Sequence, residues 1–322
     1  MIEIRDLVKV YRGRRGTVRA NDGITLHVGP GEVFGLLGHN GAGKTTLLSQ
    51  VVGLLRPTGG SIHLDGCDLV ARPALARSLC SLQQQAQVPM VGITPRAAVE
   101  LTGRIRGGGR REVVRRGAAL AAALDIERWY DTPGEKLSGG VLRLVSFAMA
   151  AVEPGRVVML DEPSNDVDPV RRRLLWQEVR RLADEGTAVL LVTHAVAEAE
   201  RVVDRLAVLD RGRVVAEATP SALKGGADAD LRVELVLPPG RPAPVLPPCV
   251  HDAHHSGPRL VARAPADAAD AVGHWLVGQQ RTGAVEEWHL GALSLEDVYV
   301  RLVGEDADRA GSEEVHRAAL VR

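Results

Sequence analysis

The fold is decided by the stretch Gly38-His39-Asn40-Gly41-Ala42-Gly43-Lys44-Thr45, which continues with Thr46. It fits the pattern GxxxxGK[ST], a glycine-rich loop that wraps phosphate groups. The loop follows an apolar run, Val33–Leu37, and opens a helical pattern, Thr45–Leu54, as the motif requires. Its glycines let backbone N–H groups curl around phosphates, and the helix presents its positive N-terminal end to them. The loop therefore predicts a nucleoside triphosphate site, with Lys44 at the β- and γ-phosphates and Thr45 on Mg²⁺.

Two carboxylates end a second apolar run, Val157-Val158-Met159-Leu160-Asp161-Glu162. Alone, this pattern is typical of a strand capped by a solvated acidic turn. With a phosphate loop upstream, it favours a catalytic edge of a sheet. We expect Asp161 to hold Mg²⁺, usually through a water, and Glu162 to polarise an attacking water.

A second anion site is indicated by Leu137-Ser138-Gly139-Gly140, which opens the amphipathic run Val141–Val152. A Ser-Gly-Gly turn at a helix N-terminus offers backbone donors to an anion. One nucleotide would fill one such site. Two sites in one chain therefore suggest a nucleotide held between two copies.

Strands alternate with helices along most of the chain, which predicts an α/β fold with a mainly parallel sheet covered on both faces. The expected strands include Ile2–Ile4, Ile24–Val28, Val157–Leu160, Ala188–Val192 and Arg205–Leu209, and the expected helices include Val170–Glu185 and Val196–Val203. Ala- and Arg-rich helices between Thr94 and Leu124, broken at Arg106–Gly109, look like an insertion into that sheet. We place an ATPase domain at 1–226, with its helical subdomain at about 89–155.

A smaller domain is expected after a boundary near Lys224–Ala229. It contains a Pro-rich stretch, Pro238–Pro248, that disfavours regular structure. Its expected elements are strands at Leu231–Leu237, Leu260–Arg263 and Val285–Leu290 and helices at Ala266–Val277 and Leu295–Val303. We assign 230–304 to an α+β accessory domain and 305–322 to a flexible polar tail.

Composition excludes several classes of protein. Forty basic and forty acidic residues among 322 leave no formal net charge, which argues against binding nucleic acid by bulk charge. Three distant cysteines argue against a zinc ribbon or disulfide framework. The N-terminus lacks a signal-peptide core, and the longest apolar stretches fall far below the ~20 residues of a membrane span. We expect a soluble protein that serves a membrane through a partner.

These motifs, in their order and spacing over about Met1–Leu223, resemble the nucleotide-binding subunit of an ABC (ATP-binding cassette) transporter, whose signature LSGGQ matches Leu137–Gly140. The resemblance implies a P-loop NTPase sheet with a helical subdomain. It also implies that Tyr11 stacks on adenine, that Gln85 contacts Mg²⁺ and senses a membrane partner, and that His194 touches the γ-phosphate. Gln84 is the alternative to Gln85 by one position.

The resemblance implies a further role for Ser164-Asn165-Asp166-Val167-Asp168-Pro169, which matches the family's D-loop, S-x-G-L-D-P. Asp168 would help couple two ATP sites across a dimer, and it also suits a helix N-cap. Three departures stand out: Val141 replaces the Gln of LSGGQ, Asp166-Val167 replaces Gly-Leu, and Gln83-Gln84 occupies places where Pro is common. They remove no catalytic group and bear on dimer coupling.

The C-terminal domain resembles the accessory domain on ATPase subunits of drug and antibiotic exporters, chiefly through Leu293–Tyr299. An importer-type regulatory domain is the alternative, although those tend to be longer and β-rich. His251, His254 and His255 could ligate a metal, but a solvated polar loop is favoured. The Arg106–Arg116 cluster is interpreted as the solvated surface of the helical insertion.

The sequence thus predicts an ATP-hydrolysing subunit of a membrane exporter, with ATP and Mg²⁺ as ligands. Its expected partners are an integral-membrane permease and a second nucleotide-binding subunit, as a homodimer, and no nucleic acid. Its expected place is the cytoplasmic side of the cell membrane. The alternatives are a soluble ABC-type ATPase acting on a ribosome or DNA, and a degenerate, non-hydrolysing subunit. The single cassette and absent zinc cysteines disfavour the first, and the intact Lys44, Asp161, Glu162 and His194 disfavour the second.

Overall fold

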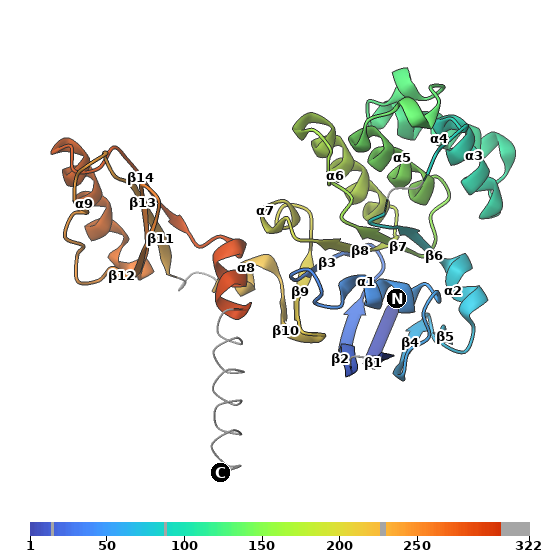
Figure 1. Ribbon diagram of the computed structural model, residues 1–322, viewed down its shortest axis with the longest axis horizontal. Coiled ribbons are helices and arrows are strands. Elements are labelled where there is room, and N and C mark those ends of the chain that lie inside the picture. Colours follow the sequence, from blue (N-terminus) through green and yellow to red (C-terminus); the bar gives the residue numbers. More distant parts are fainter. Residues whose placement is uncertain (14–15, 87–88, 226–229, 304–322) are drawn as a thin grey trace, which may run out of the picture. The chain divides into compact units, whose positions relative to one another are not determined.

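The structure, a computed structural model, describes residues 1–13, 16–86, 89–225 and 230–303. The chain divides into two compact units, Met1–Glu217 and a second that begins at Ala218 (Figure 1). Each unit has a core of its own, so we describe them separately. The tail expected at 305–322 lies outside the described residues.

The first unit is centred on a six-stranded sheet with strand order β10-β9-β3-β8-β7-β6. Pairing is parallel from β9 through β3, β8 and β7 to β6. Every residue of β3, β7 and β8 is buried, which explains why these strands read as uninterrupted apolar runs. The predicted α/β fold is confirmed. The strand bounds are β3 (Val33–Leu37), β6 (Cys80–Gln83), β7 (Val157–Asp161), β8 (Ala188–Thr193), β9 (Arg205–Asp210) and β10 (Arg213–Ala218).

A four-stranded sheet, β2-β1-β4-β5, accompanies the parallel one. Its strands pair antiparallel and are β1 (Ile2–Gly13), β2 (Gly16–Val28), β4 (Gly59–Leu64) and β5 (Cys67–Asp68). Apolar side chains from both sheets and from α1 (Lys44–Val51) share one core, for example Ile4, Phe34 and Leu48. The sequence does not predict β4, β5, β6 or α2 (Pro73–Leu79), because such short segments show little periodicity.

The helical subdomain comprises α3 (Pro95–Ile105), α4 (Arg110–Ala123) and α5 (Gly139–Ala151), which gather beyond β6 and β7 in Figure 1. The expected break between α3 and α4 is present, and Gly107 supplies a φ of 97° there. At Gly103 a Cβ would lie 2.6 Å from a methyl of Val113, so the glycine lets α3 and α4 approach closely. Two more helices, α6 (Pro169–Asp184) and α7 (Val196–Ala199), complete this unit.

The second unit begins with α8 (Pro220–Leu223) and contains an antiparallel sheet, β12-β13-β11-β14. Val272 and Leu276 of α9 (Ala269–Arg281) pack against the inner face of this sheet, on Val233 and Leu235. A last helix covers 295–303, as the sequence predicts. The strands are β11 (Leu231–Val236), β12 (His251–Ser256), β13 (Arg259–Ala264) and β14 (Glu287–Ala292).

One expectation for this unit is wrong. The histidines assigned to a solvated loop, His251, His254 and His255, lie in β12, the outermost strand next to β13. All six residues of β12 are exposed, so no apolar alternation marks the strand in the sequence. Within the described ranges, no group of three or more His, Cys, Asp or Glu side chains could hold a metal ion.

The helices of the described residues were compared in length and apolar character with what a membrane span requires. No helix among them combines the length and apolar character that a bilayer crossing needs.

Candidate functional site

The phosphate loop runs from the end of β3 to the start of α1, as the sequence predicts. Gly43 has a φ of 106°, and a Cβ there would lie 2.1 Å from the carbonyl oxygen of Ala20. Only glycine fits this position, because both the backbone angle and the space exclude a side chain. The buried Asn21 donates to the Gly43 carbonyl at 3.1 Å and accepts from Gln50 at 2.5 Å, which fixes the end of the loop.

Lys44 is buried, and its ammonium donates to the carbonyls of Gly38 at 2.5 Å and His39 at 3.0 Å. Burial lowers the pKa of Lys44 from its usual value, although the charges of Glu162 and Asp161 oppose this shift. A buried ammonium held by two backbone carbonyls suits an incoming phosphate, because phosphate oxygens would compensate the ammonium for the water that it lost on burial.

Thr45 and Asp161 meet across the loop, since the threonine hydroxyl donates to the carboxylate at 2.9 Å. Burial raises the pKa of Asp161 and the charge of Glu162 adds to the rise, whereas Thr45 and nearby cations oppose it. With Gln85, these side chains offer hydroxyl, carboxylate and amide oxygens to one cavity. Hard oxygen ligands with one carboxylate suit Mg²⁺, which completes its octahedron with water and substrate phosphates.

Glu162 is held in an unusual geometry just beyond β7. Its φ is 53°, and its backbone N–H donates to the Val192 carbonyl on β8 at 2.9 Å. The hydroxyl of Thr193 donates to one carboxylate oxygen at 3.1 Å, and Nδ1 of His194 lies 2.7 Å from the other. Because an ionised carboxylate only accepts, Nδ1 carries the proton and Nε2 is left for another partner.

Residues of the phosphate loop converge with Gln85, Asp161 and Glu162 on one cavity of about 370 Å³, whereas His194 does not line it but contacts Glu162. The sequence analysis did not single out one of its lining residues, Ala20. The lining is Ala20, Asn40, Gly41, Gly43, Lys44, Thr45, Thr46, Gln85, Asp161 and Glu162.

Other predicted residues do not line this cavity. Ser138 caps α5 by accepting from the N–H of Val141 at 3.4 Å, and Gly139 and Gly140 form the first turn of that helix. Tyr11 lies on β1 with 43% of its surface exposed and the Lys9 ammonium 5.3 Å from its ring centre. Asp168 caps α6, and N–H groups and the guanidinium of Arg171 hold its pKa below the usual range.

Arg143, a buried cation in α5, was not predicted from the sequence. Its guanidinium donates to the carbonyls of Gln84 at 3.1 Å and Gln85 at 2.8 Å, so it fixes the backbone that presents Gln85. A basic residue inside the mostly apolar run Val141–Val152 was the available signal. Thr193, whose hydroxyl donates to the carboxylate of Glu162, was not predicted from the sequence either.

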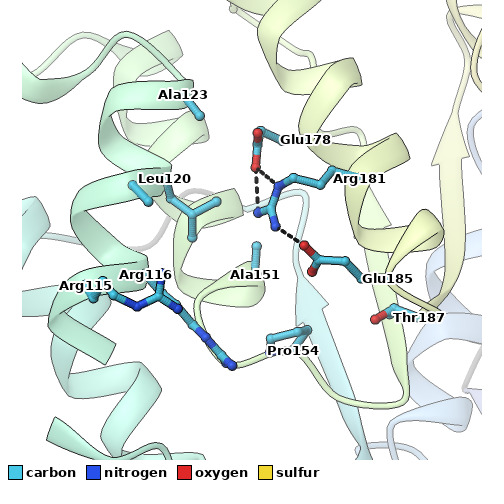
Figure 2. A pocket seen from close by; sticks show the side chains of 11 residues that line it. Arg115, Arg116, Leu120, Ala123, Ala151, Pro154, Glu178, Arg181, Glu185 and Thr187 are labelled. Carbon is cyan, nitrogen blue, oxygen red and sulfur yellow. Dashed lines mark hydrogen bonds and ion pairs between the residues drawn. The ribbon is translucent and has the colours of Figure 1, made fainter. Parts of the chain in front are cut away.

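A larger cavity, of about 580 Å³, lies between α4, α5 and α6 and contains none of the predicted site residues (Figure 2). Its guanidinium groups already pair with carboxylates: Arg115 and Arg116 with Glu112, and Arg181 with Glu178 and Glu185. Volume alone therefore does not mark the chemical site.

Comparison with known proteins gives a consistent result. The sequence profile "ABC transporter" matches residues 21–165. The daunorubicin/doxorubicin resistance ATP-binding protein DrrA of Streptomyces peucetius is 34% identical over 97% of this chain and 95% of its own. The Nod factor export ATP-binding protein I of Paraburkholderia xenovorans is 38% identical over 68% of this chain and 71% of its own.

Solved structures agree on the fold. The structure of an ATP-binding subunit of an ABC transporter superposes with a TM-score of 0.64 at 27% identity, over 70% of this chain and 92% of that one. A dimeric ATP-binding cassette with ADP and phosphate superposes with a TM-score of 0.62 over 68% of this chain and 98% of that one. The second is 22% identical, so it supports the fold alone.

Proposed function

The chain belongs to the ABC transporter family, in which it is an ATP-binding subunit with ATPase activity, and we propose that it powers export of a small or lipid-like compound through a separate membrane permease. Two relatives are named for resistance to daunorubicin and doxorubicin and for export of Nod factor. Their names support an export role. As part of the proposal, we place the chain at the cytoplasmic side of the membrane, on the permease.

The observation that carries the chemistry is the single cavity that brings the phosphate loop against Asp161, Glu162 and Gln85. We assign the phosphates of ATP to the loop from Gly38 to Thr46. Lys44 would exchange the carbonyls of Gly38 and His39 for the β- and γ-phosphate oxygens. This exchange neutralises charge where it accumulates during phosphoryl transfer.

Thr45, Asp161 and Gln85 would hold Mg²⁺. When bound, the ion neutralises phosphate charge and orients the γ-phosphate. The three side chains come from α1, β7 and the segment after β6, so they meet only in the folded protein. Their oxygens already share the cavity with the loop.

We assign Glu162 to polarise the attacking water. Its carboxylate is 3% exposed and is oriented on one side by Thr193 and on the other by His194. This arrangement leaves little freedom to rotate, so the carboxylate can accept a proton from a water in a fixed position. His194 keeps Nε2 for the γ-phosphate, which would link the phosphate to the catalytic carboxylate.

The remaining predicted residues suit a site that a second copy completes. Ser138, Gly139 and Gly140 form a helix N-terminus that does not line the cavity, and we assign them to the γ-phosphate of the partner's ATP. Tyr11 offers an exposed ring for adenine. The homodimer, with two ATP molecules between its copies, is part of this proposal.

A permease surface is supported by a groove of about 260 Å³ lined by Gln83, Gln84 and Thr102, next to the segment that carries Gln85. On the same helix as Thr102, Leu101 and Ile105 lie one turn apart and are 53% and 76% exposed. We assign this face of α3 to a cytoplasmic helix of the permease, because exposed apolar side chains beside a groove suit a protein partner.

The chemistry is tested with Glu162→Gln. We expect the variant to bind ATP as the wild type does and to lose nearly all turnover, because an amide cannot accept the proton of the water. Glu185→Gln, a control in the larger cavity, should hydrolyse ATP normally. Turnover of Glu162→Gln near the wild-type rate would contradict the role of Glu162.

The partner is tested with the same variant, tagged and purified with ATP from detergent-solubilised host membranes. We expect a polytopic membrane protein in near-equal amount. Recovery of ribosomal or DNA-bound proteins without such a permease would contradict the transport role.

A further inference from the structure

We propose that Arg171 is a positioning residue that fixes the D-loop, Ser164–Pro169, to the helical subdomain, so that the D-loop and the Ser138–Gly140 turn move together. This proposal rests on the proposed function, in which both segments contact a second copy. Arg171 does not line the cavity, and would act through Asp168.

The contacts of Arg171 join two segments that are far apart in the sequence. Nη1 donates to the carboxylate of Asp168 at 2.8 Å. On the other side, Nε donates to the Asp125 carbonyl at 3.0 Å and Nη2 to the Asp125 carboxylate at 2.6 Å. Asp125 lies just after α4, so one guanidinium bridges the D-loop and the helical subdomain.

The position of this guanidinium is tightly determined. Its carbon lies 4.7 Å from the centre of the Trp129 ring, and the Arg171 side chain is 17% exposed. The flat fork satisfies three acceptors while it stacks on the ring, which a lysine ammonium cannot do. A partly buried, multidentate ion pair of this kind is worth more than an exposed single pair.

A second contact ties the D-loop to the helix that begins at the Ser138 turn. The carbonyl of Asp166 packs on Gly140 so closely that a Cβ there would lie 2.3 Å away. Asp166 itself has a φ of 63°, in the left-handed region that favours glycine. The D-loop is therefore held by its surroundings at two residues, Asp166 against Gly140 and Asp168 against Arg171.

Two contacts on a short loop, at Asp166 and at Asp168, transmit displacement better than one. If the helical subdomain rotates, Asp125 carries Arg171 with it, and Arg171 carries Asp168. Removal of Arg171 breaks the link to Asp125 and leaves the Gly140 contact. The hydrogen bond from Arg172 to the Val167 carbonyl also remains, but within the described residues Arg172 makes no hydrogen bond or ion pair with Asp125. We infer that ATP sites in the dimer would then respond to one another less, while each site still binds its nucleotide.

The test compares the full chain with Arg171→Ala and Asp125→Asn. Asn also tolerates the left-handed φ of 53° at position 125, so this variant removes the charge and keeps the backbone. For Arg171→Ala we expect kcat to fall about tenfold and the Hill coefficient for ATP to fall toward about 1, with KM and nucleotide affinity within about twofold. The change in Asp125→Asn should be in the same direction and smaller, because the Asp125 carbonyl remains an acceptor.

The double variant provides the decisive comparison. If the two residues act through one contact, Arg171→Ala with Asp125→Asn should be no slower than Arg171→Ala alone. Arg171→Lys should fall between wild type and Arg171→Ala. The control is Arg173→Ala on the same helix, because Arg173 is exposed and its side chain makes no hydrogen bond or ion pair within the described ranges; it should behave as wild type.

Three results would overturn the proposal: wild-type kcat and cooperativity in Arg171→Ala, additive effects in the double variant, or a loss of nucleotide affinity that accounts for the lower rate. Glu162→Gln separates this failure from failure of the proposed function. An inactive Glu162→Gln beside a wild-type-like Arg171→Ala rejects the positioning role alone, whereas an active Glu162→Gln rejects the catalytic assignment.

Discussion

Asp161 and Lys44 are charged groups that the fold buries beside the phosphate loop. Burial raises the pKa of the carboxyl and lowers the pKa of the ammonium, so each charged form is disfavoured relative to the unfolded chain. Burying charged groups at a cost in free energy is typical of a ligand-binding site, because the ligand supplies the interactions that these charges lack. The buried charges of Asp161 and Lys44 therefore favour nucleotide binding but lower the stability of the protein without its ligand.

This trade-off predicts the behaviour of Asp161→Asn. In the folded protein the pKa of Asp161 is raised. The protonated carboxyl therefore stabilises the fold at low pH, and this stabilisation is lost as the pH rises through the folded pKa. At pH 7 we expect Asp161→Asn to be more stable than wild type without ligand. The difference in free energy of unfolding between the variant and the wild type should shrink as the pH falls toward about 4, near the pKa of aspartate in the unfolded chain. Urea unfolding at several pH values measures it, and a less stable variant at pH 7 would contradict the argument.

At the scale of elements, the start of α5 is constrained by the D-loop and not by its own helix. Gly140 has a helical backbone, yet a Cβ there would meet the Asp166 carbonyl at 2.3 Å. Backbone cannot move aside as a flexible side chain can. Gly140 of the Ser-Gly-Gly turn therefore serves close packing of two segments, in addition to offering its N–H group to an anion.

Gly140→Ala should therefore lower ATP turnover strongly, because the added methyl displaces the D-loop from α5. The matched control is Gly109→Ala at the start of α4, where a Cβ meets nothing within 4 Å and φ is −66°. Steady-state ATPase assays and thermal unfolding of both variants test this. Equal activities would show that the close contact does not matter.

At the scale of the whole molecule, the two compact units have separate cores. The first core contains residues from Ile2 to Leu209 and the second from Val233 to Val285. Every residue that lines the nucleotide cavity belongs to the first unit. The cavity that we propose for ATP thus takes no lining side chain from the second unit.

A chain ending at residue 225 should consequently fold and bind ATP with an affinity within about twofold of the full chain, since no core residue of the first unit is removed. Circular dichroism and titration with a fluorescent nucleotide measure this. An unfolded or non-binding truncated chain would show that the first unit depends on the second.

The sequence by itself determined what is local. The phosphate loop, its strand and its helix are contiguous, so spacing and glycine chemistry were sufficient to predict them. The buried strands β3, β7 and β8 were also readable, because parallel strands covered on both faces are uninterrupted apolar runs. In contrast, β12 was missed because none of its residues is buried.

Only the tertiary structure decided which distant residues meet. Glu162 is oriented by Thr193 and His194 because β7 and β8 are parallel neighbours with Asp161 opposite Val192, so residues just past their ends come together. Arg143 on the Gln84 and Gln85 carbonyls, and Arg171 between Asp125 and Asp168, depend in the same way on packing of separate elements. Strand order and helix packing, which no local pattern encodes, set these contacts.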